Sequence, residues 1–250
     1  MAWSWFSVCF LALLSSGVVP EGKETPSWIS GNLQGMMFSV MNGGNVRFHS
    51  DNPSNFTGLT VCLRVLTEQT FSIQLNFINQ THFVRLDNNI LYVNGRSVSF
   101  YPFFMVPVYQ EHWPWKNRCL TWESSTGMAQ LWSDGKMSVR KGIARGQVFS
   151  DLDELLFDQF VGQVSDIYVW DRALGPQDLY NFLYYHYNLP SGNILDWHQI
   201  QYNTSGYAVL EPTFVKPYSV KSTRHKKQKK GQGLRRRVHK ERIKKKINLQ

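Results

Sequence analysis

Cysteine is scarce in this sequence, with three residues in a chain of 250. Two of them, Cys62 and Cys119, lie outside the first twenty residues, which is too few for a zinc site of the usual four-ligand kind. The sequence also lacks His-Glu-x-x-His, Gly-x-Ser-x-Gly and a glycine-rich phosphate loop. Its histidines are scattered, and the neighbouring acids Asp153 and Glu154 are placed wrongly for paired acid–base work. We therefore expect a non-enzymatic protein.

Charge is absent from the first twenty residues, which centre on the apolar run 6–14 and continue with small residues. Such a segment is typical of a secretory signal, so we predict a signal peptide over residues 1–20. An uncleaved membrane anchor is the alternative, but the run is short for spanning a bilayer. No later segment approaches transmembrane length. The protein is therefore expected to be secreted into the extracellular space.

Acidic and large apolar residues are few in the last 35 residues. Residues 216–250 hold 15 Lys/Arg and one acid, a net of +14, whereas residues 1–215 have a net charge of −5. We predict a basic, disordered tail over 216–250 that binds polyanions such as heparin-like chains or nucleic acid. The expected contacts are Lys226, Lys227, Lys229, Lys230, Arg235, Arg236, Arg237, Lys244, Lys245 and Lys246. A solvated extension without a binding role is the alternative.

Between residues 27 and 215 the sequence consists of short runs in which apolar and polar residues alternate. The runs cover 35–41, 45–49, 59–66, 71–77, 90–93, 96–100, 118–123, 129–132, 138–140 and 163–170. Turn signals such as Asn94-Gly95 and Asp134-Gly135 separate them. Many closely spaced strands with little helix predict an all-β, two-sheet antiparallel sandwich.

One segment breaks the alternation. Residues 176–187 place Leu179, Phe182, Leu183 and His186 at helical spacing, and Pro176 suits a first helical turn. We predict one helix whose apolar and tyrosine-rich side packs on a face of the sandwich. Stacking of a ligand on the tyrosines is the alternative.

The two remaining cysteines lie in separate alternating runs, which favours a disulfide between two strands. In an oxidising compartment an even pair is expected to bridge, although two unrelated buried thiols stay open. The bridge would close a loop of about 58 residues, worth about 4 kcal/mol by chain entropy. Export also agrees with three N-glycosylation sequons, at Asn55, Asn79 and Asn203.

The run from Cys119 to Ser124 resembles the pentraxin signature His-x-Cys-x-Ser/Thr-Trp-x-Ser/Thr, with Asn117 in the histidine position. Further matches follow in the family order: Val61–Leu63, Trp132–Lys136, Trp170-Asp171, Leu195–Trp197 and Pro212. The resemblance implies a jelly-roll domain over residues 27–215 with its helix on one face. It also implies a homo-oligomeric ring, pentamer-like, that recognises microbial or cell-debris surfaces through two calcium ions.

The calcium ligands implied by this resemblance are Asp87, Asn88, Asp158 and Gln159. A second alignment moves the first pair to Asn79-Gln80. The family's long acidic loop is missing between Gln159 and Phe160, so calcium binding is expected to be weak or lost.

The sequence thus favours a lectin-like recognition protein of innate-immune type whose calcium site is degraded. The alternative is a calcium-independent structural or interaction module that contacts polyanions through its tail.

Overall fold

Short strands provide most of the secondary structure in the computed structural model, which describes residues 27–78, 83–100, 115–184 and 190–213. Residue contacts divide the chain into two units, Met1–Glu211 and Pro212–Gln250. The predicted signal peptide, the Asn79 sequon, His186 and the basic tail all lie outside the described residues. No helix in the described ranges is long and apolar enough to cross a bilayer.

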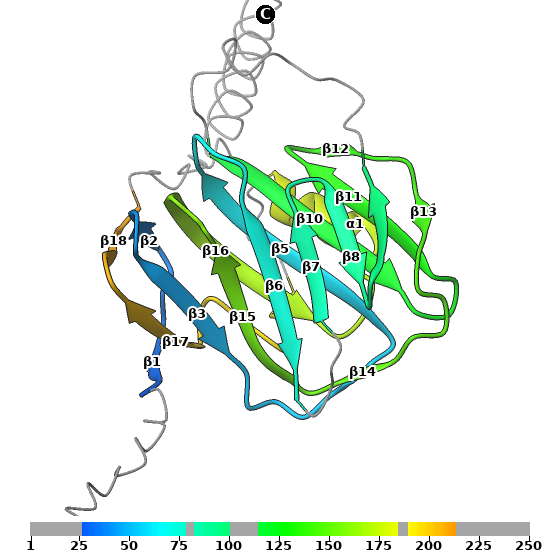
Figure 1. Cartoon of the computed structure of the whole chain (residues 1–250), viewed down its shortest axis with the longest axis horizontal. Helices are drawn as coiled ribbons and strands as arrows, with labels where there is room; N and C mark the ends of the chain where they lie inside the picture. The colour runs from blue at the N-terminus through cyan, green and yellow to red at the C-terminus, as the bar shows by residue number, and fades with distance from the viewer. Residues whose placement is uncertain (1–26, 79–82, 101–114, 185–189, 214–250) are drawn as a thin grey trace, which may run out of the picture. The chain divides into compact units, whose positions relative to one another are not determined.

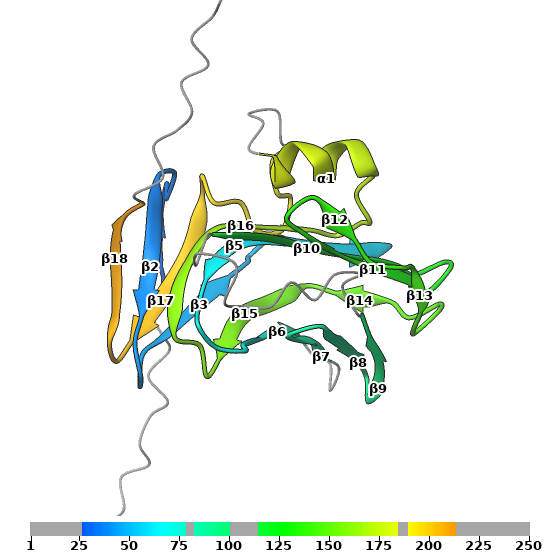
Figure 2. The same cartoon turned by 90° about the horizontal axis from the view of Figure 1, so that it is seen from above.

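Two eight-stranded sheets face each other in the first unit (Figures 1 and 2). Sheet A consists, in spatial order, of β1 (Ile29–Gly31), β17 (Ile200–Ser205), β3 (Asn45–His49), β15 (Leu152–Asp158), β6 (Ser72–Phe77), β7 (Phe83–Asp87), β8 (Ile90–Val93) and β9 (Arg96–Ser99). Sheet B consists of β12 (Lys136–Met137), β11 (Met128–Ser133), β10 (Lys116–Glu123), β5 (Gly58–Leu66), β16 (Gly162–Trp170), β2 (Met36–Val40) and β18 (Ala208–Pro212), with β13 (Lys141–Gly142) beside β11.

A small third sheet pairs β4 (Asn55–Phe56) with β14 (Phe149–Ser150). The architecture confirms the predicted all-β, two-sheet antiparallel sandwich with one short helix.

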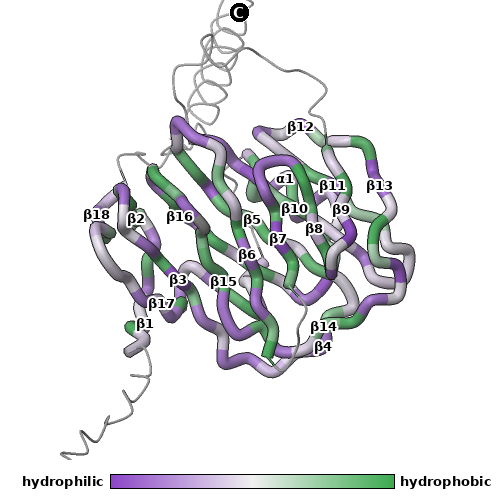
Figure 3. Tube along the Cα trace, viewed as in Figure 1, coloured by the Kyte–Doolittle hydropathy of each residue, from purple (hydrophilic) through white to green (hydrophobic). Residues whose placement is uncertain are grey.

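Aromatic side chains fill the space between the sheets. Trp122, Trp170 and Trp197 are fully buried, and the rings of Phe38 and Phe48 lie 5.7 Å apart. The indole N–H of Trp122 donates to the Ile143 carbonyl at 3.0 Å, so its polar edge is satisfied inside the core. Figure 3 shows the corresponding alternation of hydrophilic and hydrophobic residues along the strands of both sheets.

The disulfide joins two neighbouring strands of sheet B. Cys62 on β5 lies directly opposite Cys119 on β10, with the Cα atoms 4.1 Å apart. The predicted bridge is confirmed, and it ties strands within one sheet rather than one sheet to the other.

The helix α1 spans Pro176–Leu183 and covers the outer face of sheet B (Figure 2). Pro176 begins the helix as predicted, and Leu179, Phe182 and Leu183 are buried. Burial of this apolar stripe fixes the helix on β10 and leaves the outer face of sheet A on the opposite side of the sandwich.

One strand prediction was wrong in position. Residues 138–140 lie between β12 and β13 and form no strand. The Leu131 amide donates to Ser138 Oγ at 3.0 Å, so a side chain replaces the backbone carbonyl that a continuing strand would supply.

Candidate functional site

The outer face of sheet A is polar because side chains alternate along its strands. Residues on β3, β6 and β7 alternate between buried and half-buried, with Phe48, Ile73 and Val84 directed to the core. The half-buried positions line up across strands through the pairing register. One such row runs from Arg47 across β15 to Gln74, Arg85 and Tyr92.

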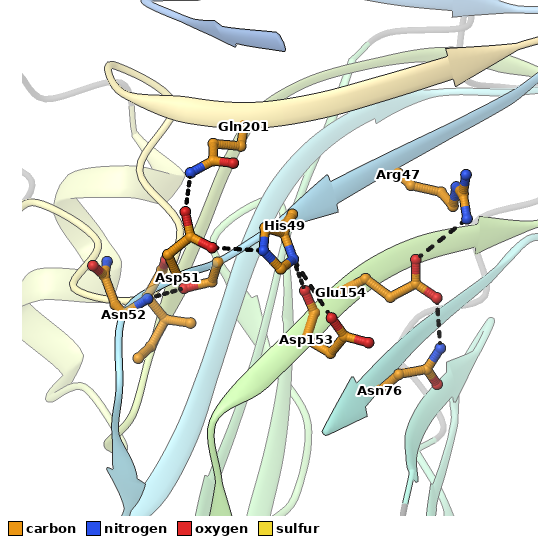
Figure 4. Close-up of polar contacts among 10 residues, drawn as sticks. Arg47, His49, Asp51, Asn52, Asn76, Asp153, Glu154 and Gln201 are labelled. Carbon is orange, nitrogen blue, oxygen red and sulfur yellow. Dashed lines mark hydrogen bonds and ion pairs between the residues drawn. The ribbon is translucent and has the colours of Figure 1, made fainter. Parts of the chain in front are cut away.

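A polar cluster around His49 occupies this face near its β17 side (Figure 4). His49 Nε2 lies 2.7 Å from Asp51 Oδ1, and Nδ1 contacts the main-chain oxygen of Asp153. The Gln201 amide donates to the other Asp51 oxygen. These hydrogen bonds lower the pKa of Asp51, and the one from Gln201 has the larger effect. The Trp28 ring stacks on His49 at 4.8 Å.

The neighbouring groups on the same face are also paired. Arg47 Nη1 lies 3.7 Å from Glu154 Oε2, and Asn76 Nδ2 donates to Glu154 Oε1 at 2.9 Å (Figure 4). Within the described residues, no three His, Cys, Asp or Glu side chains come together in a way that would hold a metal ion. The hydrogen bonds of the His49 cluster link β3, β15 and β17.

A pocket of about 770 Å³ opens where β7 and β15 end and β6 begins. Three turns surround it: Asn42–Gly44 before β3, Gln69–Phe71 before β6, and Gln159–Val161 after β15. This volume lies within the range of about 300–1,000 Å³ that small-molecule sites occupy. The pocket is thus the candidate binding site.

Two polar atoms at the pocket are buried and lack partners in the described part of the chain, namely Arg85 Nε and Ser72 Oγ. The guanidinium carbon of Arg85 lies 4.7 Å from the centre of the Tyr92 ring, which holds the side chain by a cation–π contact. A buried polar atom without a partner costs about 1–3 kcal/mol. Each of these two atoms exposes less than 1 Å², so a molecule in the pocket would reach them only after a side chain moves.

The wall formed by residues 159–161 exists because β15 passes directly to β16 in the other sheet. Gln159 adopts a positive φ of 49° and Gly162 a φ of 145°. A Cβ at Gly162 would lie 2.3 Å from the Leu66 carbonyl oxygen, so glycine is required there. Only three residues separate the two strands at the place where the sequence resemblance implies a long acidic loop.

The described side chains that line the pocket supply few of the ligands that calcium needs. Calcium takes six to eight oxygen ligands, several of them carboxylates. Among the described side chains that line the pocket, Asp87 supplies the one carboxylate, and the positive Arg85 lies two residues away on the same strand face. Asp158 lies opposite Ser72 in the β15–β6 register, but its side chain is outside the described part.

The structure brings two of the predicted metal ligands together, because Asp87 and Gln159 line the same pocket. Asn88, in the β7–β8 turn at a φ of 49°, does not line the pocket, although its amide donates to the carbonyl of the lining residue Phe71 at 3.0 Å. The Asn88 carbonyl accepts a hydrogen bond of 2.9 Å from the half-buried Arg118, whose pKa is lowered to about 10 by desolvation. The alternative pair, Asn79-Gln80, lies outside the described residues.

A family model described as "Pentaxin family" matches residues 44–212. The chain belongs to the pentraxin family. It is 32% identical to rat serum amyloid P-component over 112 residues, which cover 38% of this chain and 46% of that protein. It is 34% identical to the mouse protein over 109 residues, covering 38% and 47%. The chain spans about half the length of the curated relatives it matches.

Two solved structures share the fold of this pentraxin. A heptameric SAP-like pentraxin from Limulus polyphemus covers 73% of this chain and 97% of its own length, with a TM-score of 0.57 and 14% identity. The extracellular region of zebrafish Gpr126/Adgrg6 covers 72% of this chain and 26% of its own, with a TM-score of 0.55 and 18% identity. Pentraxins are in general non-enzymatic, lectin-like proteins that typically bind calcium and form oligomeric rings.

Asn117 replaces the signature histidine and has a structural role. It is buried, its Nδ2 donates to the Leu183 carbonyl at 3.1 Å, and its Oδ1 accepts from Arg64 Nε at 3.0 Å. The first bond satisfies a carbonyl in the last turn of α1, which has no partner within the helix. Asn117, the residue that departs from the pentraxin signature, therefore anchors the helix. It lies on sheet B, whereas the pocket lies at the end of sheet A.

Sequence reasoning missed Arg85 and Ser72. The signal was present, because Val84 and Leu86 alternate with Arg85 and Asp87 over five residues. That alternation predicts a strand on which an arginine shares one face with the candidate ligand Asp87. An arginine at that position disfavours a divalent cation at the same site, because the two positive charges repel each other.

The remaining predicted site residues stay predictions. Asn55 on β4 is exposed, whereas the Asn203 side chain on β17 donates to the Ser27 carbonyl at 3.0 Å and accepts from Arg47. A glycan on Asn203 would replace one of the two N–H groups of Nδ2 and leave the Oδ1 acceptor in place. Asn79 and the basic tail lie outside the described residues.

Proposed function

We propose that this pentraxin is a secreted recognition protein of innate-immune type that binds its ligand at the pocket on sheet A without high-affinity calcium. The observation that carries the proposal is the donor set of the pocket, with one described carboxylate at Asp87 and a guanidinium at Arg85. Family membership supports a recognition role, because relatives are lectin-like. Ligands of this class include microbial and cell-debris surfaces.

Charge and ligand count support the weak calcium binding that we propose. A dication that loses its water must regain six to eight oxygen contacts and nearby negative charge. The three-residue connection after β15 leaves no room for a further acidic segment, and Arg85 opposes positive charge in the pocket. Asp87 and Gln159, even joined by the Asp158 carboxylate, give a partial shell, so affinity in the millimolar range or weaker is expected.

Calcium titration of the purified full chain by calorimetry tests the proposal. We expect no stoichiometric binding at micromolar calcium. A micromolar site that disappears in both Asp87→Ala and Asp158→Ala would contradict it and show that the family mechanism survives. Glu154→Gln, a charge-matched change on the same sheet that is remote from the pocket lining, controls for nonspecific loss of negative charge.

The domain organisation and assembly are part of the same proposal. Residues 1–20 would be removed on export, residues 27–215 would form the pentraxin domain, and residues 216–250 would form the basic tail. A homo-oligomeric ring is supported by the family, whose members form rings. The mass of secreted material, measured by light scattering and by intact mass spectrometry after glycan removal, tests the ring and the cleavage site together.

Polyanion binding by the tail is a second candidate, favoured by the net charge of +14 over residues 216–250. Each neutralised phosphate or sulfate releases counterions, so affinity should fall steeply with salt. Changing Lys226, Lys227, Lys229 and Lys230 together to Gln should weaken heparin binding and flatten its salt dependence. Unchanged affinity at matched ionic strength would exclude this segment as the heparin site.

A further inference from the structure

We infer that Asn42, which lines the pocket on sheet A, is a site of spontaneous deamidation that slowly adds a carboxylate to the pocket. The other Asn-Gly pair of the sequence, Asn94-Gly95, is protected by the fold. The inference rests on the proposed function in one respect, because it takes this pocket as the binding site and adds a change of its charge with the age of the protein.

The first argument is the sequence of the turn between β2 and β3. Asn42 is followed by Gly43, which has no side chain to hinder attack of its main-chain nitrogen on the Asn42 side-chain carbon Cγ. The Gly43 nitrogen gives its proton to solvent and bonds to Cγ. The Cγ–Nδ2 bond then breaks, and Nδ2 takes a proton from solvent and leaves as ammonia. Water opens the cyclic imide at Cγ to give aspartate, or at the main-chain carbonyl carbon to give isoaspartate, so either product carries a carboxylate in place of the amide.

The second argument is that the turn leaves this pair open to water. Asn42 and Gly43 are both exposed, and a Cβ built on Gly43 would meet no atom within 4 Å. The turn is closed at its base, where the Gly44 amide donates to the Met41 carbonyl at 2.8 Å and the Met41 amide donates to the Tyr207 carbonyl at 3.0 Å. Among the described residues the Gly43 amide donates to no main-chain carbonyl, so its nitrogen can approach the Asn42 side chain without loss of such a bond.

The third argument is the contrast with Asn94-Gly95. This pair forms the two-residue turn between β8 and β9, and the flanking residues Val93 and Arg96 are partners in the sheet register. Both Nδ2 and Oδ1 of Asn94 are buried, and each exposes less than 1 Å². Solvent therefore reaches the leaving nitrogen only when the turn opens, so the same dipeptide is expected to persist there.

The position of Asn42 gives the change its effect. Among the described side chains that line the pocket, Asp87 is the one carboxylate and Arg85 the one cation, so this lining carries no net charge. Conversion of Asn42 adds one negative charge, which favours cations and disfavours anions in the pocket. Freshly made and aged protein would therefore differ in the charge of the pocket.

Incubation of the purified full chain in mildly alkaline buffer at body temperature, followed by peptide mapping with mass spectrometry, tests the modification. Each conversion adds one mass unit, fragment spectra assign it to a residue, and a sample digested without incubation corrects for conversion during digestion. We expect Asn42 to convert at least about tenfold faster than Asn94, because Asn94 reacts only when its turn opens. Asn42→Gln keeps an amide but needs a larger ring for the attack, so it should remove the mass gain at position 42. Gly43→Ala should slow the conversion, and Asn42→Gln still decides if alanine is not tolerated at the φ of 80°.

The effect on the pocket is measured with Asn42→Asp, which installs the product directly. Gln177→Glu is the matched control, because it adds the same charge at an exposed position of α1, outside the pocket lining. Calcium titration at low salt should show an affinity raised by about twofold or more in Asn42→Asp and unchanged in Gln177→Glu.

The outcomes separate this inference from the proposed function. Conversion of Asn42 no faster than that of Asn94 would overturn the modification site. Equal calcium affinity in Asn42→Asp and the wild type would overturn its effect on the pocket. Micromolar calcium binding by freshly purified wild type with Asn42 intact, lost in Asp87→Ala, would instead overturn the proposed function and leave the modification site standing.

Discussion

Two arginines, one on each sheet, show how differently the two outer faces are built. Arg64 on β5 packs against Phe182 of α1, its Nη1 contacts Asp166 Oδ2 at 2.6 Å, and its Nε donates to Asn117. Its guanidinium also packs 5.3 Å from the centre of the Phe182 ring. Arg85 on β7 contacts one ring and retains a buried Nε without a partner in the described part.

The difference teaches which face has a structural role and which is open to a ligand. Under the helix, polar groups are paired with one another and with the end of α1, so that face holds the fold together. At the end of sheet A, Arg85 and Ser72 line a pocket, and each has one buried atom without a partner in the described part of the chain. Such atoms also occur on sheet B, at Arg118 and Trp132, so the pocket itself is what distinguishes this end of sheet A.

The largest expected effect lies on the structural face. Cys119→Ala opens the bridge between β5 and β10, and the chain-entropy model gives a loss of about 4 kcal/mol in the free energy of unfolding. Urea unfolding of secreted protein measures it, and secretion itself should mostly fail. A loss below about 1 kcal/mol, or free thiols at Cys62 and Cys119 in non-reduced secreted protein, would show that the bridge is not part of the secreted fold.

The next effect compares the two arginines directly. Arg64→Ala leaves Asp166 and Asn117 without their partner beneath the helix and should cost about 3 kcal/mol. Arg85→Ala removes an unpaired donor and one ring contact, so it should cost less than about 1 kcal/mol. Parallel urea titrations measure both variants. Equal losses would remove the distinction between the two faces.

Many of the strands and the helix were predictable because they rest on local patterning, and the disulfide because two cysteines remain in a chain expected to be exported. Alternation around Cys62 and Cys119 placed both cysteines on strands, and Pro176 with the spacing of Leu179 and Leu183 marked the helix. What local patterning could not give was the pairing of β5 with β10, because register depends on contacts between segments distant in sequence.

The pocket was beyond sequence reasoning for the same physical reason. It is built from turns at 42–44, 69–71 and 159–161, which come together only when the two sheets pack. Asp87 and Gln159 were identified through the family resemblance and share the pocket, whereas Asn88 does not line it. Arg85 was missed because the short strand β7 had not been recognised.

The smallest expected effect concerns the paired end of sheet A, around His49. Hydrogen bonds from Gln201 and then His49 hold the pKa of Asp51 below its ordinary value of 3.8. A carboxyl group whose pKa is lower in the folded state adds stability above its unfolded pKa and loses it as pH falls through the folded value. Asp51→Asn should therefore be slightly less stable than wild type at neutral pH, and the difference should shrink as the pH falls through the lowered pKa of Asp51.

Thermal melts from pH 7 to pH 2.5 measure this difference. Gln201→Ala removes the stronger of the two hydrogen bonds and should bring the pKa of Asp51 back toward 3.8, which reduces the acid-dependent loss without abolishing it. Arg85→Ala, at the other end of the same sheet, should lose melting temperature with falling pH to the same extent as the wild type. Should the Asp51→Asn difference stay constant across this pH range, the His49 cluster would contribute packing alone, and pairing of charge would not distinguish the two ends of sheet A.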